Sequence, residues 1–323
     1  MHLMPPVARR RAVALIACLA LPSLAGCLPL DGKAERTFSA TEPKPTALVL
    51  DSRFLDVDLQ AVKGDSVGIE ATIILQTSGG NETAEREIEK CLVRVERDGT
   101  TLRVVQGPEG ESGKKIEASS WSGRGTLKLT LPEGVPFRIA SASGDVNLHG
   151  DFGAVAGVVR IASGDLKGTL SVDSFEQHSA SGDAKLSFEH GLTSLLCKSA
   201  SGDVSVAAPS IADATFEAAS GNIDVRGLAG PAKATAASGD ISLLFQTFGS
   251  NAHATIKAAS GDISVRLPAG SKPSGSIKTA SGEIRTDVPA QKGKRSTELT
   301  GDGAKLEISA ASGDVTVTTA PAT

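Results

Sequence analysis

The chain has 323 residues and a formal net charge of −4, from 33 Lys and Arg against 37 Asp and Glu. Phosphate binding needs a basic face, and this balance is too near neutral to predict one, so we expect no nucleic acid partner. Aromatic residues make up only 3% of the chain, which leaves few stacking platforms for bases or sugars. Gly is abundant, and the small and β-branched residues that dominate the rest favour a long, thin core.

The first residues have the pattern of a bacterial secretion signal. Three arginines, Arg9–Arg11, precede the apolar run Ala12–Leu21. This run is too short to span a bilayer, which takes about 20 residues, but it suits a signal peptide. The segment Leu24-Ala25-Gly26-Cys27 resembles the lipobox of bacterial lipoproteins. The resemblance implies a signal peptide over 1–26 and lipidation of Cys27, with palmitate among its acyl chains. An ordinary secretory signal with an incidental cysteine is the alternative.

The same resemblance predicts where the protein resides. An Asp after the lipidated Cys is the usual inner-membrane retention signal of Gram-negative lipoproteins, and Leu28 occupies that position here. We therefore expect a protein of the bacterial cell envelope that is anchored to the outer membrane, because two or three acyl chains make a stable anchor. Its body could face the periplasm or the cell exterior. The membrane is the expected partner, and another envelope protein or a glycan are further candidates.

Residues 27–37 are expected to be the lipidated Cys and a polar tether, and residues 38–135 a β-rich N-terminal cap. Such a cap would cover the first repeat, since an open strand edge invites strand addition. The Gly-, Ser- and charge-rich stretch 107–123, which contains the single Trp121, is expected to be a loop. The cap is predicted from alternating apolar runs at Ala47–Leu50, Leu55–Leu59, Val67–Leu75, Cys91–Val95, Leu102–Val105 and Thr126–Leu131.

A repeat dominates residues 136–319. The tripeptide Ala-Ser-Gly occurs nine times, with spacings of 18 to 22 residues and a final spacing of 31 residues. An acidic residue or its amide follows each Gly, and an apolar residue comes next, as in Asp145-Val146. Alternation on both sides predicts strand, turn, strand, with a positive φ at the Gly. The final spacing contains Gln291–Arg295, which is expected to be an insertion at one corner.

Two architectures could use this unit. In an antiparallel meander each Ser-Gly would cap a hairpin, and nothing would require the same residue at the same place in every repeat. In a β-solenoid each repeat is one coil, and like residues stack along the axis. Uniform columns of Ala, Ser, Gly and Asp favour the second arrangement. We therefore predict an all-β fold, a parallel β-solenoid with coils of about 19–21 residues.

These features resemble a known family. The Ala-Ser-Gly-Asp units from Ala142 to Asp314, together with the strand region from about Thr37 to Leu131, are similar to the "putative adhesin", β-strand-repeat family of bacterial envelope proteins. The resemblance covers most of the chain after the signal. It implies a right-handed β-helix and no known catalytic residues, and the family name is a label rather than a tested activity.

The acidic column is the main candidate for chemistry. Carboxylates about 4.8 Å apart repel by only ~1 kcal/mol per pair in water, and a backbone hydrogen bond to each side chain offsets that. A turn-forming role is therefore one interpretation. Divalent cation binding is the other, because hard cations take carboxylate oxygens. No catalytic residue and no cofactor is predicted. The candidate cation row consists of Asp145, Asp165, Asp183, Asp203, Asp240 and Asp262.

The remaining histidines and cysteines give weaker signals. The four His residues after the signal share no spacing and predict no metal or catalytic site: His149, His178, His190 and His253. Cys197 falls in a column otherwise filled by residues such as Val159 and Ile256, so it should be buried, and Cys91 alternates with Val93. A disulfide between them would require the cap to fold back along the solenoid. Two separate buried thiols are the alternative.

Three functions remain open. A non-enzymatic, membrane-anchored lipoprotein that serves as a scaffold or as an adhesion or binding surface needs only the lipobox and the repeats. A carbohydrate-active β-helix would need clustered carboxylates and aromatic subsites, whereas the acids here are evenly spread and Trp is single. Envelope-stress sensing through a partner protein is neither supported nor excluded by the sequence.

Overall fold

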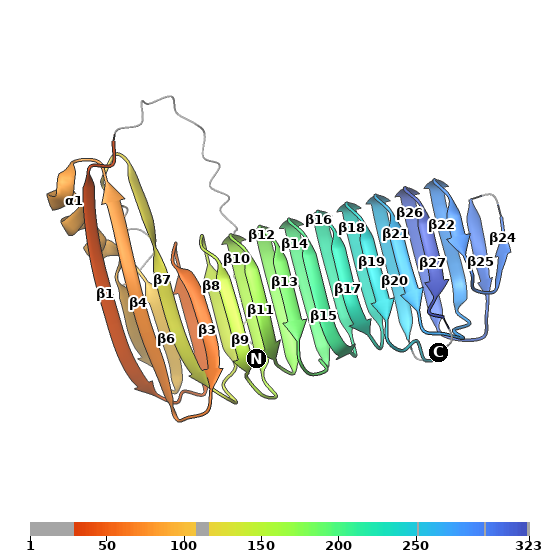
Figure 1. Cartoon of the computed structure of the whole chain (residues 1–323), viewed down its shortest axis with the longest axis horizontal. Coiled ribbons are helices and arrows are strands. Elements are labelled where there is room, and N and C mark those ends of the chain that lie inside the picture. The colour runs from red at the N-terminus through yellow and green to blue at the C-terminus, as the bar shows by residue number, and fades with distance from the viewer. Residues whose placement is uncertain (1–28, 108–115, 251, 294, 322–323) are drawn as a thin grey trace, which may run out of the picture.

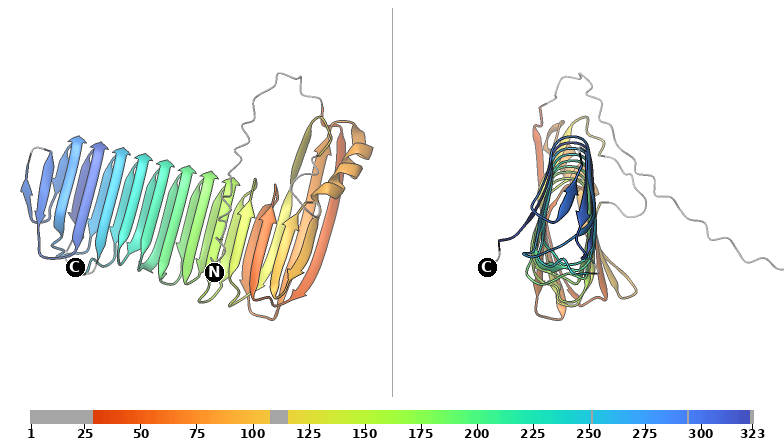
Figure 2. Two further views of the ribbon diagram at one scale, coloured as in Figure 1. Left: turned by 180° about the vertical axis from the view of Figure 1, so that it is seen from behind. Right: turned by 90° about the vertical axis from the view of Figure 1, so that its right-hand side faces the viewer.

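The computed structural model describes residues 29–107, 116–250, 252–293 and 295–321. These residues form two long β-sheets that face each other along an extended rod, and the end-on view shows the two layers (Figures 1 and 2). The predicted all-β class is confirmed. In spatial order, the 13-stranded sheet A consists of β1 (Gly32–Pro43), β4 (Ser66–Thr77), β7 (Trp121–Pro132), β3 (Asp56–Val62), β9 (Val146–Asp151), β11 (Leu166–Ser171), β13 (Ala184–Phe188), β15 (Val204–Ile211), β17 (Ile223–Leu228), β19 (Ile241–Phe245), β21 (Ile263–Leu267), β27 (Val315–Thr319) and β23 (Ile284–Thr286).

Sheet B has 14 strands and forms the opposite layer. Each repeat contributes one strand to sheet B, turns at its Ala-Ser-Gly unit, and contributes the next strand to sheet A. In spatial order its strands are β24 (Ala290–Lys292), β25 (Ser296–Thr300), β22 (Ser274–Ser281), β26 (Lys305–Ser312), β20 (His253–Ser260), β18 (Ala232–Ser238), β16 (Ala214–Ser220), β14 (Ser194–Ser201), β12 (Ser174–Ser181), β10 (Ala156–Ser163), β8 (Phe137–Ser141), β2 (Ala47–Ser52), β6 (Thr101–Gln106) and β5 (Val93–Asp98).

The pairing between coils is parallel and places like residues side by side. Ser181 of β12 is in register with Ser163 of β10 on one side and with Ser201 of β14 on the other. The same pattern continues through β16, β18 and β20. Successive repeats are therefore stacked coils, which confirms the solenoid and excludes the meander.

Inward-facing side chains of the two sheets meet in a continuous apolar core. One inner column of sheet B contains Val159, Gln177, Cys197 and Phe216, in register from strand to strand. Cys197 is fully buried, as predicted from its column. Each coil buries its apolar residues against its two neighbours, so stability accumulates along the rod.

The N-terminal region extends both sheets and differs from two expectations. The segment expected as a featureless tether already contains the start of β1, which pairs antiparallel with β4 along its whole length. Trp121 begins strand β7 instead of lying in a loop. Of the loop predicted over 107–123, residues 108–115 lie outside the described residues and residues 121–123 belong to β7. Helix α1 (Gly80–Ile88) and a short 3-10 turn, η1 (Glu89–Cys91), connect β4 to β5 and were not expected. Helix α1 packs against β1 and β4 at the end of the rod (Figure 1).

The C-terminal end shows a change in coil order. The last repeat, with strands β26 and β27, is inserted between the coil of β20 and β21 and the coil of β22 and β23. The expected corner insertion at 291–295 is in fact part of a hairpin: β24 and β25 pair antiparallel, and β25 pairs antiparallel with β22. Lys294 lies outside the described residues. The hairpin therefore forms the last strands of sheet B (Figure 1).

The lipobox and Cys27 lie outside the described residues. Within the part of the chain that the structure describes, no helix has the length and apolar character needed to cross a membrane.

Candidate functional site

The repeating corner is built around the glycine of each Ala-Ser-Gly unit. All nine of these glycines have positive φ, between 106° and 136°, which L-residues rarely adopt. The predicted positive φ is therefore confirmed. A second constraint was not foreseen, because a Cβ at Gly221 would overlap the carbonyl oxygen of Gly202 in the neighbouring coil. The glycines stack directly upon one another, and that close approach leaves no room for a side chain.

The acidic residues beside these glycines form a hydrogen-bonded ladder. The Oδ1 atom of Asp145 accepts a hydrogen bond from the backbone N–H of Asp165 at 2.9 Å, and Asp165 accepts one from Asp183 at 3.0 Å. Asn222 takes the same place with its amide oxygen, which accepts from the N–H of Asp240 at 2.8 Å. The remaining bonds of the ladder, all between 2.7 and 3.0 Å, join Asp145 to Asp56, Asp203 to Asp183, Asn222 to Asp203, Asp262 to Asp240, Asp314 to Asp262, and Glu283 to Asp314.

The ladder starts at a residue that the repeat pattern did not identify. Asp56 occupies the first position although no Ala-Ser-Gly precedes it, and its Oδ1 accepts the N–H of Asp145 at 3.0 Å. The signal was present in the residues that follow it, because Asp56-Val57-Asp58-Leu59 has the same alternation as Asp145-Val146-Asn147-Leu148. A repeat defined by its Ala-Ser-Gly turn does not include Asp56.

This geometry supports the turn-forming interpretation of the candidate row. All six candidates have Oδ1 committed to a backbone N–H of the next coil, and they stand in one line instead of converging. Among the described residues, no three His, Cys, Asp or Glu side chains come together as metal ligands. The ladder does not use the second carboxylate oxygen of each Asp. Calcium binding therefore stays a prediction, and melting temperatures measured at increasing calcium concentrations would test it.

A groove runs beside the corner on the outer surface of sheet B. It has a volume of about 1020 Å³ and is floored by the exposed alanines that precede each turn serine. The buried alanines Ala218, Ala236 and Ala258 also line it, and the stems of Lys198, Lys233 and Lys257 form one side. The groove therefore combines an apolar floor with a charged rim of three lysines and Glu217. In the order of the stacked coils, its exposed alanines are Ala200, Ala219, Ala237, Ala259, Ala311 and Ala280.

Ion pairs between coils hold the side chains of this rim. Glu217 lies 3.0 Å from Nζ of Lys198 and 3.5 Å from Nζ of Lys233, which belong to the coils on either side of it. The hydrogen bond from Lys198, aided by the charge of Lys233, holds the pKa of Glu217 below its usual value. These groups are about half exposed, so each pair contributes little to stability, typically below ~1 kcal/mol.

The sequence matches a family model across these coils and their N-terminal extension. The model is Toastrack DUF4097, and it matches residues 46–318, which is most of the chain. The chain belongs to the Toastrack DUF4097 family. No curated protein is similar enough to give a match.

Several solved structures resemble the Toastrack chain at low sequence identity. A "putative adhesin" from Parabacteroides distasonis is 13% identical, with 90% of this chain and 98% of that chain covered and a TM-score of 0.40. A "putative adhesin" from Bacteroides fragilis is 12% identical, with coverages of 89% and 97% and a TM-score of 0.38. A "putative cell adhesion protein" from Clostridium sporogenes is 13% identical, with coverages of 89% and 100% and a TM-score of 0.22.

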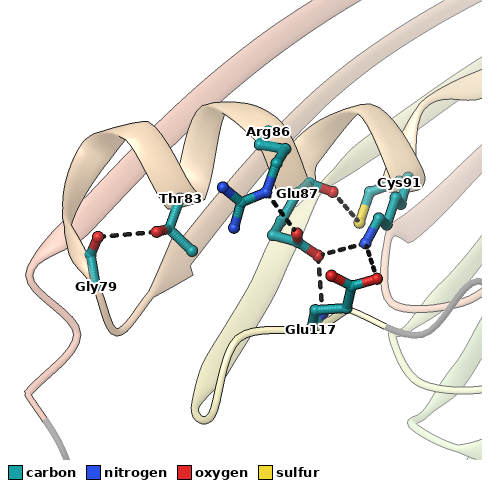
Figure 3. A network of polar contacts seen from close by, with 7 residues as sticks. Gly79, Thr83, Arg86, Glu87, Cys91 and Glu117 are labelled. Carbon is teal, nitrogen blue, oxygen red and sulfur yellow. Dashed lines mark hydrogen bonds and ion pairs between the residues drawn. The ribbon is translucent and has the colours of Figure 1, made fainter.

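The N-terminal end of the Toastrack rod contains a buried polar network under helix α1 (Figure 3). The carboxylate of Glu87 is fully buried and accepts hydrogen bonds from Nζ of Lys90 at 2.9 Å, Nε of Arg86 at 3.2 Å and the backbone N–H of Glu117 at 2.8 Å. Burial alone would raise the pKa of Glu87, but these donors outweigh it and hold the pKa below its ordinary value. The network fixes α1 to the segment that leads into β7.

The two cysteines of the Toastrack domain are separate, buried and unbridged. Cys91 ends η1 next to β5, whereas Cys197 lies in β14, with five strands of sheet B between those two strands. Burial raises the pKa of the Cys197 thiol to about 12 and that of Cys91 to about 11, so both remain protonated and unreactive. Of the two alternatives for these residues, the structure shows separate thiols.

The four histidines are dispersed over the Toastrack surface. His178 is bonded to Glu176 at 2.7 Å, His190 to the hydroxyl of Ser171 at 2.7 Å, and His253 to Thr255 at 3.1 Å. His149 lies on the outer face of sheet A, beside Lys167 and Thr169. Each histidine has its own local surroundings, and the structure brings no two of them together.

Proposed function

We propose that this Toastrack protein is a non-enzymatic lipoprotein of the bacterial envelope, anchored to the outer membrane through Cys27, and that its rod is a spacer and scaffold that presents a binding or adhesion surface. The observation that carries the proposal is the unbroken stack of parallel coils from β8 to β22. Every coil is tied to its neighbours by two strand ladders and by the acidic ladder. Because each coil contacts only its neighbours, the stack extends in one direction and separates its far end from the anchor by the length of the rod.

The position of the chain's entry supports the spacer role. Residues that follow the lipobox enter the fold at β1, which is the edge strand of sheet A at the N-terminal end of the rod. A lipid at Cys27 would therefore hold the rod by one end, only a few residues from its first strand. The outer faces of both sheets carry rows of charged and hydroxyl side chains, and these rows remain available to a partner.

Anchoring is tested by labelling cells with radioactive palmitate and separating their membranes. The wild-type protein and the variant Cys18→Ser, which changes only the signal peptide, are expected to incorporate label and to fractionate with the outer membrane. The variant Cys27→Ser is expected to lose both properties. Label in Cys27→Ser, or an unlabelled wild-type protein, would contradict the proposed anchor.

The non-enzymatic part of the proposal is tested with a panel of envelope and plant polysaccharides, assayed for binding and for cleavage. We expect no new reducing ends and no unsaturated products with any member of the panel. Cleavage of any glycan would favour the carbohydrate-active alternative. Pull-down of the lipidated protein from envelopes, followed by identification of co-purifying proteins, would show whether a stress-sensing partner is bound.

A further inference from the structure

The free edge of strand β1 is blocked at both ends and open in the middle. Within the described residues, β1 has one strand neighbour, β4, so its other edge faces outward. Neighbouring residues in a strand direct their N–H and C=O groups to opposite edges. The N–H of Lys33 donates to Oδ1 of Asn81 at 2.9 Å instead of to β4. The odd-numbered residues of β1 therefore direct their backbone groups to the free edge.

Side chains already form hydrogen bonds with the backbone groups near the two ends of this free edge. The carbonyl of Glu35 accepts a hydrogen bond from Arg36 at 3.0 Å, and the carbonyl of Pro43 accepts one from Arg97 at 2.6 Å. Pro43 has no N–H to offer. Such blocking is how native proteins prevent unwanted strand pairing. No such contact is made in the described chain at Thr37, Ser39 or Thr41, which leaves a short open window.

The window is self-complementary about Ser39. If a second β1 paired antiparallel across a two-fold axis at this residue, Ser39 would face Ser39 of the second copy, and Thr37 would face Thr41. Hydroxyl pairs of this kind stabilise neighbouring strands. On the inner face, Phe38 of one strand would face Ala40 of the other. Both residues are only partly buried in the single chain, so pairing would cover them.

The position of helix α1 also suits this pairing, because the helix covers one half of β1 and leaves the other half free. It covers only the Gly32 half of β1, where Glu85 and Glu89 bind Arg36 at 2.6 and 3.2 Å (Figure 1). The half of β1 that contains Phe38 and Ala40 has no helix over it. Antiparallel pairing would place the covered half of one strand beside the uncovered half of the other. The helix of each copy would then extend over the exposed end of its partner's core.

We infer that two copies of this chain associate head to head through the Thr37–Thr41 window of β1, forming one continuous sheet across a two-fold axis. The paired rods would point away from each other, and each would keep its C-terminal hairpin free. This inference is independent of the lipid anchor, since it rests only on the edge of β1 and on α1.

The test uses the full chain in detergent micelles at micromolar concentration and measures mass by sedimentation. The wild type is expected at twice the protomer mass. Ser39→Lys and Ser39→Glu should each be monomeric, because like charges would face each other across the axis. An equimolar mixture of the two variants should recover the double mass, because opposite charges would then face each other. Ser242→Lys and Ser242→Glu, on the exposed face of β19, are the matched controls and should remain dimeric.

A crosslink provides a second measurement. Facing residues that exchange backbone hydrogen bonds have Cα atoms about 5.5 Å apart, within the range of a disulfide. Oxidised Ser39→Cys should therefore run as a covalent dimer, and Ser242→Cys should not. Circular dichroism confirms that each variant is folded. A monomeric wild type, an unaffected Ser39→Lys variant, or a mixture that stays monomeric would each overturn the inference.

Discussion

The side chain of Asp203 accepts a hydrogen bond from the backbone N–H of Asn222 in the next coil, at 2.7 Å. The acidic residue of each repeat thus acts between coils. Asn222 makes the same bond to Asp240 without a charge, so the ladder requires an acceptor oxygen rather than a carboxylate.

Replacement of Asp203 should show whether the ladder depends on an acceptor oxygen or on a negative charge. Asp203→Ala is expected to lower the free energy of unfolding by about 1 kcal/mol, because it removes a hydrogen-bond acceptor. Asp203→Asn keeps the acceptor and is expected to be close to wild type. Urea unfolding monitored by circular dichroism measures both. An equal loss of unfolding free energy in the two variants would mean that the negative charge, and not the hydrogen bond, stabilises the stack.

A side chain on the glycine column should be costly. Gly221 has a φ of 127°, and a Cβ there would overlap the carbonyl of Gly202. Gly221→Ala is therefore expected to destabilise the protein by more than the ~1–2 kcal/mol of a left-handed conformation alone. Gly249 has open space around it and no positive φ, so Gly249→Ala is the control with little expected effect. A mild Gly221→Ala variant in thermal unfolding would contradict the close stacking of coils.

Gln177 is a polar residue in an apolar column, and its removal should be favourable. Its side chain is fully buried, and neither its amide nitrogen nor its oxygen has a hydrogen-bond partner in the described structure. Gln177→Leu is expected to raise the free energy of unfolding by about 1–3 kcal/mol, the usual cost of an unsatisfied buried group. Gln177→Ala removes the same group but leaves a cavity, so it should gain less. A less stable Gln177→Leu variant would show that the amide is satisfied in solution.

The Glu87 network should make the N-terminal end sensitive to acid. Because the pKa of Glu87 is lower in the folded state than in the unfolded chain, the ionised group stabilises the fold above its unfolded pKa. That contribution is lost as the pH falls through the folded pKa. We expect Glu87→Gln to cost about 1–3 kcal/mol at neutral pH and to differ less from wild type in acid. Urea midpoints measured from neutral to acidic pH check this, and a constant difference would contradict it.

The repeats made much of this fold predictable, because each Ala-Ser-Gly-Asp unit encodes a turn and two alternating strands locally. The stacking followed from the uniform columns, and the burial of Cys197 followed from its column. Strand β1 lies mostly in the region predicted to be β-rich, but no alternating run was predicted for it, because its inner positions include Arg36 and Glu42, which hide the alternation. Helix α1 was missed because it lies in a short polar stretch after Gly79.

The order of the final coils could not be predicted for a different reason. The units at Gly261, Gly282 and Gly313 offer nearly identical surfaces, so the local sequence does not specify which coil stacks on which. The hairpin of β24 and β25 pairs with β22 and takes the outer position. The last coil therefore stacks between its two predecessors, an arrangement set by packing over long range.

A disulfide scan across this junction tests the stacked-coil account most directly. Lys257 of β20 is in register with Ser309 of β26, and Ser309 is in turn in register with Lys278 of β22. Adjacent strands lie about 4.8 Å apart, within disulfide range, and the next strand lies beyond it. We expect oxidised Lys257→Cys/Ser309→Cys to form an intramolecular disulfide and Lys257→Cys/Lys278→Cys to remain reduced. The opposite result would contradict the observed coil order, and a failure of both pairs would contradict parallel stacking itself.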